Sequence, residues 1–147
     1  MADERHVEAW RRLCVKQGVG LGALMGSRGD EFAAALAAAS LALPAGVVST
    51  EREVNERLRL WLSGAGAMLA TDHVELRRWL VDLGFVERDG YGRAYVRTSP
   101  PPAAYAGAVA SLAAIDPAAV AHETREALAR DRALRRAKHE AATGGRA

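Results

Sequence analysis

Residues 50–62 read TEREVNERLRLWL. Thr50 stands three positions before Glu53, which is the spacing of a capping box, in which each side chain binds the other residue's backbone N–H. This pattern predicts a helix that begins after Thr50. The apolar residues that follow recur at the spacing of one helical face: Val54, Leu58, Trp61 and Leu62. The helix is expected to end before the glycines at 64 and 66.

Residues 71–84 read TDHVELRRWLVDLG and predict a second helix. Thr71 or Asp72 can cap its first turn, and Gly84 is a suitable residue to end it. Its apolar residues form one stripe: Leu76, Trp79, Leu80 and Leu83.

The periodicity changes after this helix, where residues 85–97 read FVERDGYGRAYVR. Two short segments, 85–88 and 93–97, have the residue types of β-strands. Between them, residues 89–92 read DGYG, and these residue types favour the tight turn of a hairpin. We therefore expect two strands joined as a β-hairpin.

A third helix is predicted upstream over residues 30–43, where Pro44 ends it. Its apolar face consists of Phe32, Leu36, Ala39 and Leu43. Three helices followed by a hairpin is the chain order of a winged helix-turn-helix. The sequence thus predicts a mainly α protein with a winged helix-turn-helix domain at residues 28–98, in which the helix at 71–83 is the recognition helix.

Further helices are expected on both sides of this domain. Residues 1–27 predict an N-terminal helix and a glycine-rich linker. The apolar stripe of that helix consists of Val7, Trp10, Leu13 and Cys14. Residues 99–147 predict a proline-rich linker and a basic C-terminal helical tail, with a helix that starts at Pro117, because proline suits the first helical position.

Five side chains could contact DNA from such a domain: His73, Arg77, Arg78, Arg88 and Arg93. If Leu76 is at the centre of the buried stripe, steps of 100° per residue place the two adjacent arginines on the outward half of the recognition helix, with the histidine at its margin. The other two arginines flank the turn of the hairpin. Because an arginine fork donates two parallel hydrogen bonds to guanine or phosphate, we predict double-stranded DNA as the partner.

The charge distribution leaves a second function open. Residues 49–98 carry eight basic and eight acidic side chains, whereas residues 117–147 carry seven basic and four acidic ones. A neutral domain binds DNA weakly as a monomer, so a homodimer or help from the basic tail is expected. Val74 and Val81 also fall on the outward face, and the arginine pair could form surface ion pairs instead. The alternative is a non-enzymatic protein–protein interaction module on a winged-helix scaffold.

The quoted motifs resemble a bacterial family. Residues 50–58 read TEREVNERL, residues 72–88 fit DxxxLRRxLVDxGFxER, and residues 92–97 fit GxxYxR. Together they resemble the domain of unknown function 2087 over about residues 48–97. That domain occurs in hypothetical proteins and attached to small predicted transcriptional regulators. The resemblance implies a transcription-regulatory module, and it supplies no catalytic residues.

We find no pattern that indicates an enzyme, a metal site or a cofactor. The histidines are never spaced at i, i+4 with a second ligand, and a single cysteine, Cys14, excludes an internal disulfide and a multi-cysteine zinc site. The glycines at 18, 20 and 22 lack the strand and the lysine that accompany a phosphate-binding loop. The start of the chain lacks the features of a signal peptide, and no run of 18 apolar residues occurs. We therefore expect a cytoplasmic protein that does not enter a membrane, and no residue pattern identifies a small-molecule effector.

Overall fold

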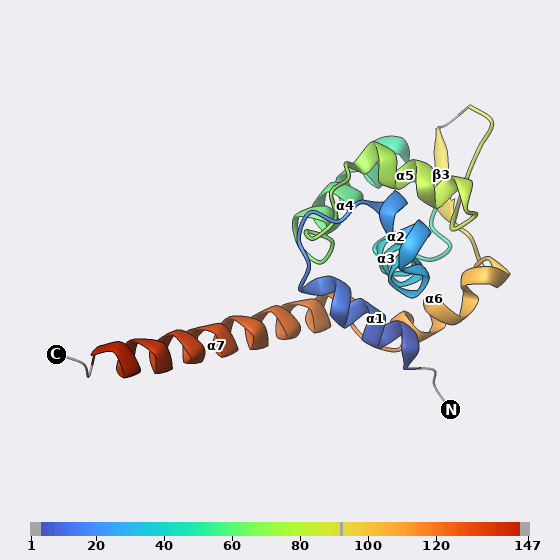
Figure 1. The fold of residues 1–147 in the computed structure, drawn as a ribbon. Coiled ribbons are helices and arrows are strands. Elements are labelled where there is room, and N and C mark those ends of the chain that lie inside the picture. The colour runs from blue at the N-terminus through green and yellow to red at the C-terminus, as the bar shows by residue number, and fades with distance from the viewer. Residues whose placement is uncertain (1–3, 92, 145–147) are drawn as a thin grey trace.

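The computed structural model describes residues 4–91 and 93–144. The elements run in the order α1 (Arg5–Cys14), α2 (Leu21–Ser27), α3 (Gly29–Leu41), β1 (Ser49–Thr50), α4 (Glu51–Ser63), α5 (His73–Asp82), β2 (Val86–Arg88), β3 (Ala94–Arg97), the 3₁₀ turn η1 (Ala103–Tyr105), α6 (Ala106–Ala113) and α7 (Pro117–Gly144). The fold is mainly helical, as predicted. Figure 1 shows helices gathered around α3, the β-hairpin at one edge, and α7 projecting from the body.

The helix starts of α4 and α5 are set by their caps. The Thr50 hydroxyl accepts a hydrogen bond from the backbone N–H of Glu53 at 3.1 Å, and the backbone N–H of Thr50 donates to the Glu53 carboxylate at 3.0 Å. The capping box is therefore confirmed. At α5 the cap is Asp72, whose carboxylate accepts from the backbone N–H of Glu75 at 2.8 Å.

Helix α3 lies at the centre of the body and is buried on every side. Its residues from Glu31 to Ser40 are all buried, whereas the sequence pattern predicted a single apolar face. A helix that is apolar all round is stable only when protein surrounds it, and α1, α2, α5 and α6 contact α3 here. The one charged residue among them, Glu31, is neutralised by Lys16 at 2.6 Å and Arg12 at 3.4 Å.

The predicted hairpin is present and belongs to a three-stranded antiparallel sheet of order β1-β3-β2. Val86 pairs with Arg97 and Arg88 pairs with Tyr95 between β2 and β3, while Ser49 of β1 pairs with Tyr95 of β3. The sequence did not predict β1, because a two-residue strand directly before a helix cap has no detectable periodicity. Gly92 of the predicted turn lies outside the described residues.

The glycine-rich segment between α1 and α3 is packed against the body. Leu21 and Leu24 of α2 are buried. Val19, two residues before α2, pairs with the connection between α4 and α5: its backbone N–H donates to the carbonyl of Met68 at 2.9 Å, and its carbonyl accepts from the backbone N–H of Ala70 at 2.7 Å. This segment therefore helps to fix the α4–α5 connection.

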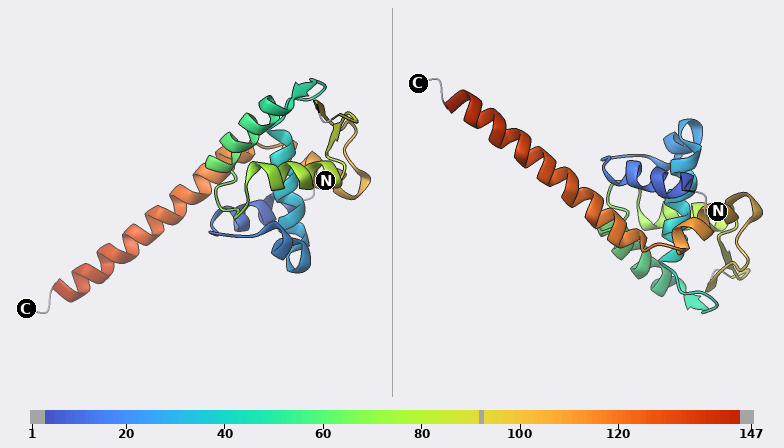
Figure 2. Two further views of the ribbon diagram at one scale, coloured as in Figure 1. Left: turned by 90° about the horizontal axis from the view of Figure 1, so that it is seen from above. Right: turned by 90° about the horizontal axis from the view of Figure 1, so that it is seen from below.

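Helix α7 is attached to the body only near its start. Trp10, which is fully buried, donates from its indole Nε1 to the Pro117 carbonyl at 2.9 Å, and Ala121 is the buried residue of the helix. From residue 129 to residue 144 every side chain is exposed. In both views of Figure 2 this part of α7 extends away from the remaining helices. The described part of the chain has no single helix long and apolar enough to cross a membrane, although η1–α6 and α7, bent by 66°, reach that length and apolarity together.

Cys14 is buried, and burial raises the pKa of its thiol to about 11, a rise that the nearby Arg125 partly opposes. Because the thiolate is the reactive form, we expect no reaction of Cys14 with Ellman's reagent in the native protein at pH 8 and one thiol per chain in urea. The folded pKa lies above the unfolded value of 9.0. The protonated thiol of Cys14 therefore contributes fully to the free energy of unfolding below pH 9, and this contribution declines as the pH rises toward 11. Labelling of the native protein at pH 8 as fast as in urea would contradict the expected protection of the thiol. The Cys14→Ala variant is the control for the pH dependence of the free energy of unfolding.

Candidate nucleic-acid interface

Helix α5 buries one side and leaves the other open. Leu76 and Leu80 are fully buried. On the opposite side Arg78 is exposed and Val74 retains 39% of its accessible surface, while Val81 is half-buried. The outward face thus combines a cation with two apolar side chains, as the helical periodicity predicted.

Arg77 is turned toward α4 and β3, contrary to the outward position predicted for it. Its guanidinium bonds the side-chain carbonyl of Asn55 and the carboxylate of Glu51, the latter at 3.0 Å, and it lies 5.7 Å from the ring centroid of Tyr95. Only 17% of its side chain is exposed. The helical angle alone could not show that two polar residues of α4 lie within its reach. In this position Arg77 fixes α5 against α4 and the sheet.

Arg78 and Arg88 line a shallow hollow between α5 and β2. The hollow is completed by Val74, Arg77, Val81 and Asp82. Neither Arg78 nor Arg88 makes an ion pair with a described residue, so both guanidinium groups remain available to a ligand. The structure therefore brings together two of the arginines that the sequence placed on different elements.

His73 and Arg93 lie on the other side of Arg77, next to α4. The Nε2 atom of His73 is 3.2 Å from the guanidinium of Arg59. Arginine has no acceptor, so this contact requires an imidazole that accepts at Nε2. Arg93 lines a second hollow with Thr50 of β1 and with five residues of α4: Glu51, Arg52, Asn55, Glu56 and Arg59.

The two hollows meet at Arg77, because it lines one of them and bonds two residues that line the other. Each lining contributes three arginines to a continuous group of six, which we call the arginine strip: Arg52, Arg59, Arg77, Arg78, Arg88 and Arg93. Three carboxylates interrupt it: Glu51, Glu56 and Asp82. Residues 49–98 are neutral as a whole, yet this surface is positive, which suits an anionic partner.

The family comparison covers both hollows. Residues 27–97 match the DUF2087 family. The family is described as an uncharacterized protein conserved in bacteria, and the match spans just under half of the chain. It confirms the predicted resemblance and extends it upstream to include α3. No curated protein and no solved structure matches the chain.

The DUF2087 segment contains surface residues that the sequence did not single out. Tyr91, at the tip of the hairpin, is 86% exposed, and the guanidinium of Arg93 lies 5.9 Å from the centroid of its ring. Arg52 and Arg59 belong to the strip as well. Tyr91 could have been identified from the sequence, because it is an aromatic residue in a glycine-rich turn. The two α4 arginines could not, because only the structure shows that β3 lies beside α4.

The connection between α4 and α5 in the DUF2087 segment comprises residues 64–72. It is longer than the three or four residues that usually join the helices of a helix-turn-helix. Its course is fixed from outside by the pairing with Val19 and by Arg125 of α7, which donates to the carbonyls of Gly64 and Ala65 at 3.0 Å each. Helix α5 is therefore positioned by the flanking helices as well as by α4.

Proposed function

We propose that this protein is a bacterial transcription regulator, without catalytic activity, that binds double-stranded DNA through a winged helix-turn-helix. In this proposal α3, α4 and α5 are the three helices and the β2–β3 hairpin is the wing. The observation that carries the proposal is the exposed face of α5, which lies beside Arg88 of β2 and presents Arg78, a cation that makes no ion pair with a described residue.

The arrangement supports a division of roles within the arginine strip. Arg78 projects from the outward face of α5 and is the side chain for base edges or phosphates in the major groove. Arg88 and Arg93 belong to the hairpin side of the strip and suit the DNA backbone. Arg77, held by Glu51 and Asn55, acts as a positioning residue. His73 lies at the start of α5 next to Arg59 and would contact DNA only at its edge.

Binding by one copy is expected to be weak. The strip carries six arginines against three carboxylates, so its net charge is small for a DNA-binding surface. The exposed part of α7 adds five cations: Arg130, Arg132, Arg135, Arg136 and Lys138. Two of these, Arg130 and Arg135, pair with acidic residues one turn earlier in the helix. A homodimer, or the remaining cations of α7, would supply the additional affinity.

Replacing Arg78 and Arg88 by alanine together tests the proposal. With duplexes selected from a random-sequence pool at low salt, we expect the double variant to bind about tenfold more weakly or worse. The dependence of log K on log salt should become shallower by about two if both contact phosphates. Gel-shift titrations at several salt concentrations measure both effects.

The matched control removes two exposed arginines outside the strip, Arg28 and Arg57. This variant loses the same charge and should keep most of the wild-type affinity. The proposal fails if no duplex shifts at high micromolar protein, or if the two double variants lose affinity equally.

Exposed apolar side chains favour a second candidate, a protein–protein interaction module. Leu60 on α4 is 75% exposed, and Val48, just before β1, is 68% exposed. Apolar residues exposed to this degree are typical of contact surfaces when they gather on one face. This candidate predicts a complex or oligomer whose formation changes little with salt. Light scattering after gel filtration at low and high salt distinguishes it from DNA binding.

A further inference from the structure

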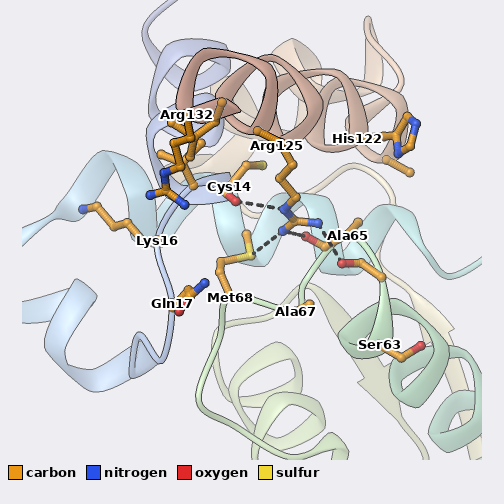
Figure 3. Close-up of a pocket in the computed structure, with 15 residues that line it drawn as sticks. Cys14, Lys16, Gln17, Ser63, Ala65, Ala67, Met68, His122, Arg125 and Arg132 are labelled. Carbon is orange, nitrogen blue, oxygen red and sulfur yellow. Dashed lines mark hydrogen bonds between the residues drawn. The ribbon is translucent and has the colours of Figure 1, made fainter. Parts of the chain in front are cut away.

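A hollow of about 850 Å³ lies at the base of α7, on a different part of the molecule from the arginine strip. Its walls come from the end of α1, the α4–α5 connection and the first turns of α7, as Figure 3 shows. The volume lies within the range of small-molecule sites in proteins. We infer that this hollow binds a small organic anion that carries an apolar group.

The first reason is the unusual pairing of Arg125. Its Nε donates to the Cys14 carbonyl at 2.9 Å, and its two terminal nitrogens donate to the carbonyls of Gly64 and Ala65 at 3.0 Å each. A further contact reaches the sulfur of Met68 at 3.3 Å. These acceptors carry no formal charge, so the guanidinium keeps a net positive charge in the hollow that the ends of α1 and α4 offset only in part.

The second reason is Arg132, which stands seven residues after Arg125 and therefore on the same face of α7. It lines the hollow and makes no ion pair with a described residue. In Figure 3 its side chain extends from α7 toward the segment that carries Lys16 and Gln17, whereas His122 points away. Arg132 is thus a cation with free donors directed across the hollow.

No carboxylate balances these cations within the hollow. Among residues 4–91 and 93–144, neither an aspartate nor a glutamate lines it. Lys16 pairs with Glu31 at 2.6 Å, but Glu31 is shared with Arg12 at 3.4 Å, so this cluster also retains one positive charge. Because the chain as a whole has almost as many acidic as basic residues, a hollow without any acidic side chain favours an anionic ligand.

The remaining lining defines the other half of the ligand. The apolar part of the lining includes Val15, Ala65, Ala67, Met68, Leu128 and Ala129. They suit a ring or a short hydrocarbon group, while a carboxylate or sulfonate would reach Arg132 and the donors of Gln17. This inference does not depend on the proposed function, because the site shares no residue with the arginine strip and Arg132 is only one of the α7 cations that could add affinity for DNA.

The probe for this site is 8-anilinonaphthalene-1-sulfonate, an aromatic anion whose fluorescence increases in an apolar site. We expect saturable binding to the native full-length protein at one probe per chain. Arg132→Gln should weaken it at least fivefold, because the sulfonate loses its charged donor. Arg136→Gln, which removes the same charge one turn further along the exposed helix, should leave it unchanged. The neutral analogue N-phenyl-1-naphthylamine should bind more weakly than the anion.

Amide chemical shifts locate the probe on the protein. We expect the largest changes at Gln17 and in the connection over residues 64–68, with urea stability the same in both variants. The inference is overturned if the probe does not saturate, if Arg132→Gln and Arg136→Gln bind it equally, or if the shifts change elsewhere. Arg125 is left intact in this experiment because its contacts hold the fold together.

Discussion

Replacing Gly66 by alanine should lower the free energy of unfolding by about 3 kcal/mol, because the new methyl group has no space. A Cβ atom built at Gly66 would lie 2.3 Å from Cζ3 and 2.4 Å from Cε3 of Trp61. The indole cannot move aside freely, because it stacks on Trp10 with the ring centroids 6.3 Å apart. Urea denaturation followed by tryptophan fluorescence measures the loss.

A double-mutant cycle with Trp61→Leu shows whether this clash is the cause. If it is, Gly66→Ala should cost clearly less in the Trp61→Leu background than in the wild type. Gly22→Ala is the control, since its Cβ would have no neighbour within 4 Å and it lies in helix α2. That variant should be neutral or slightly stabilising. Equal costs of Gly66→Ala in the two backgrounds would refute the explanation.

Replacing Arg125 by methionine should lower the free energy of unfolding by roughly 2 to 3 kcal/mol. Methionine keeps an apolar stem but removes every donor, so the carbonyls of Cys14, Gly64 and Ala65 lose their charged partner. These carbonyls lie at the ends of α1 and α4, where helices have unsatisfied acceptors and where a cation is favourable. Urea denaturation measures the loss.

Hydrogen exchange shows where this stability is lost. Amides in the first turns of α7 should exchange faster in Arg125→Met, because the helix loses its attachment to the α4–α5 connection. Arg130→Met is the matched control: it is exposed on the same helix, and its ion pair with Glu126 spans 4.0 Å. Its stability should stay within about 0.5 kcal/mol of the wild type. A similar loss in both variants would show that helix charge matters rather than the three carbonyls.

The positions and caps of α4 and α5 could be predicted from the sequence because they depend on residues close together in the chain, whereas α2 lies in a segment that was expected to be a glycine-rich linker. The capping box at Thr50 and the cap at Asp72 are local hydrogen bonds, and the hairpin follows from a local change of period. By contrast, the partners of Arg77 stand 22 and 26 positions earlier, on α4. No periodicity reports which side chains of two packed helices meet.

The hollow at the base of α7 could not be predicted from the sequence, because it too depends on residues far apart in the chain. Cys14, Gly64 and Arg125 are widely separated in the chain, and they meet only because α7 packs back against α1. The sequence predicts a helix from Pro117 onward, and α7 begins there. What the sequence could not indicate is that one of its arginines is directed inward to backbone carbonyls, a kind of acceptor that every residue provides.

The alanine-built centre of the fold sets a limit on how the molecule can change. Six of the ten buried residues of α3 are alanines, so much of the surface that the neighbouring helices contact consists of methyl groups. The surrounding helices can exchange their solvent-facing residues without moving, but a larger side chain on α3 would push several of them apart at once. Redesign of this protein for a new partner could therefore change the exposed residues of the outer helices, but hardly any residue of α3.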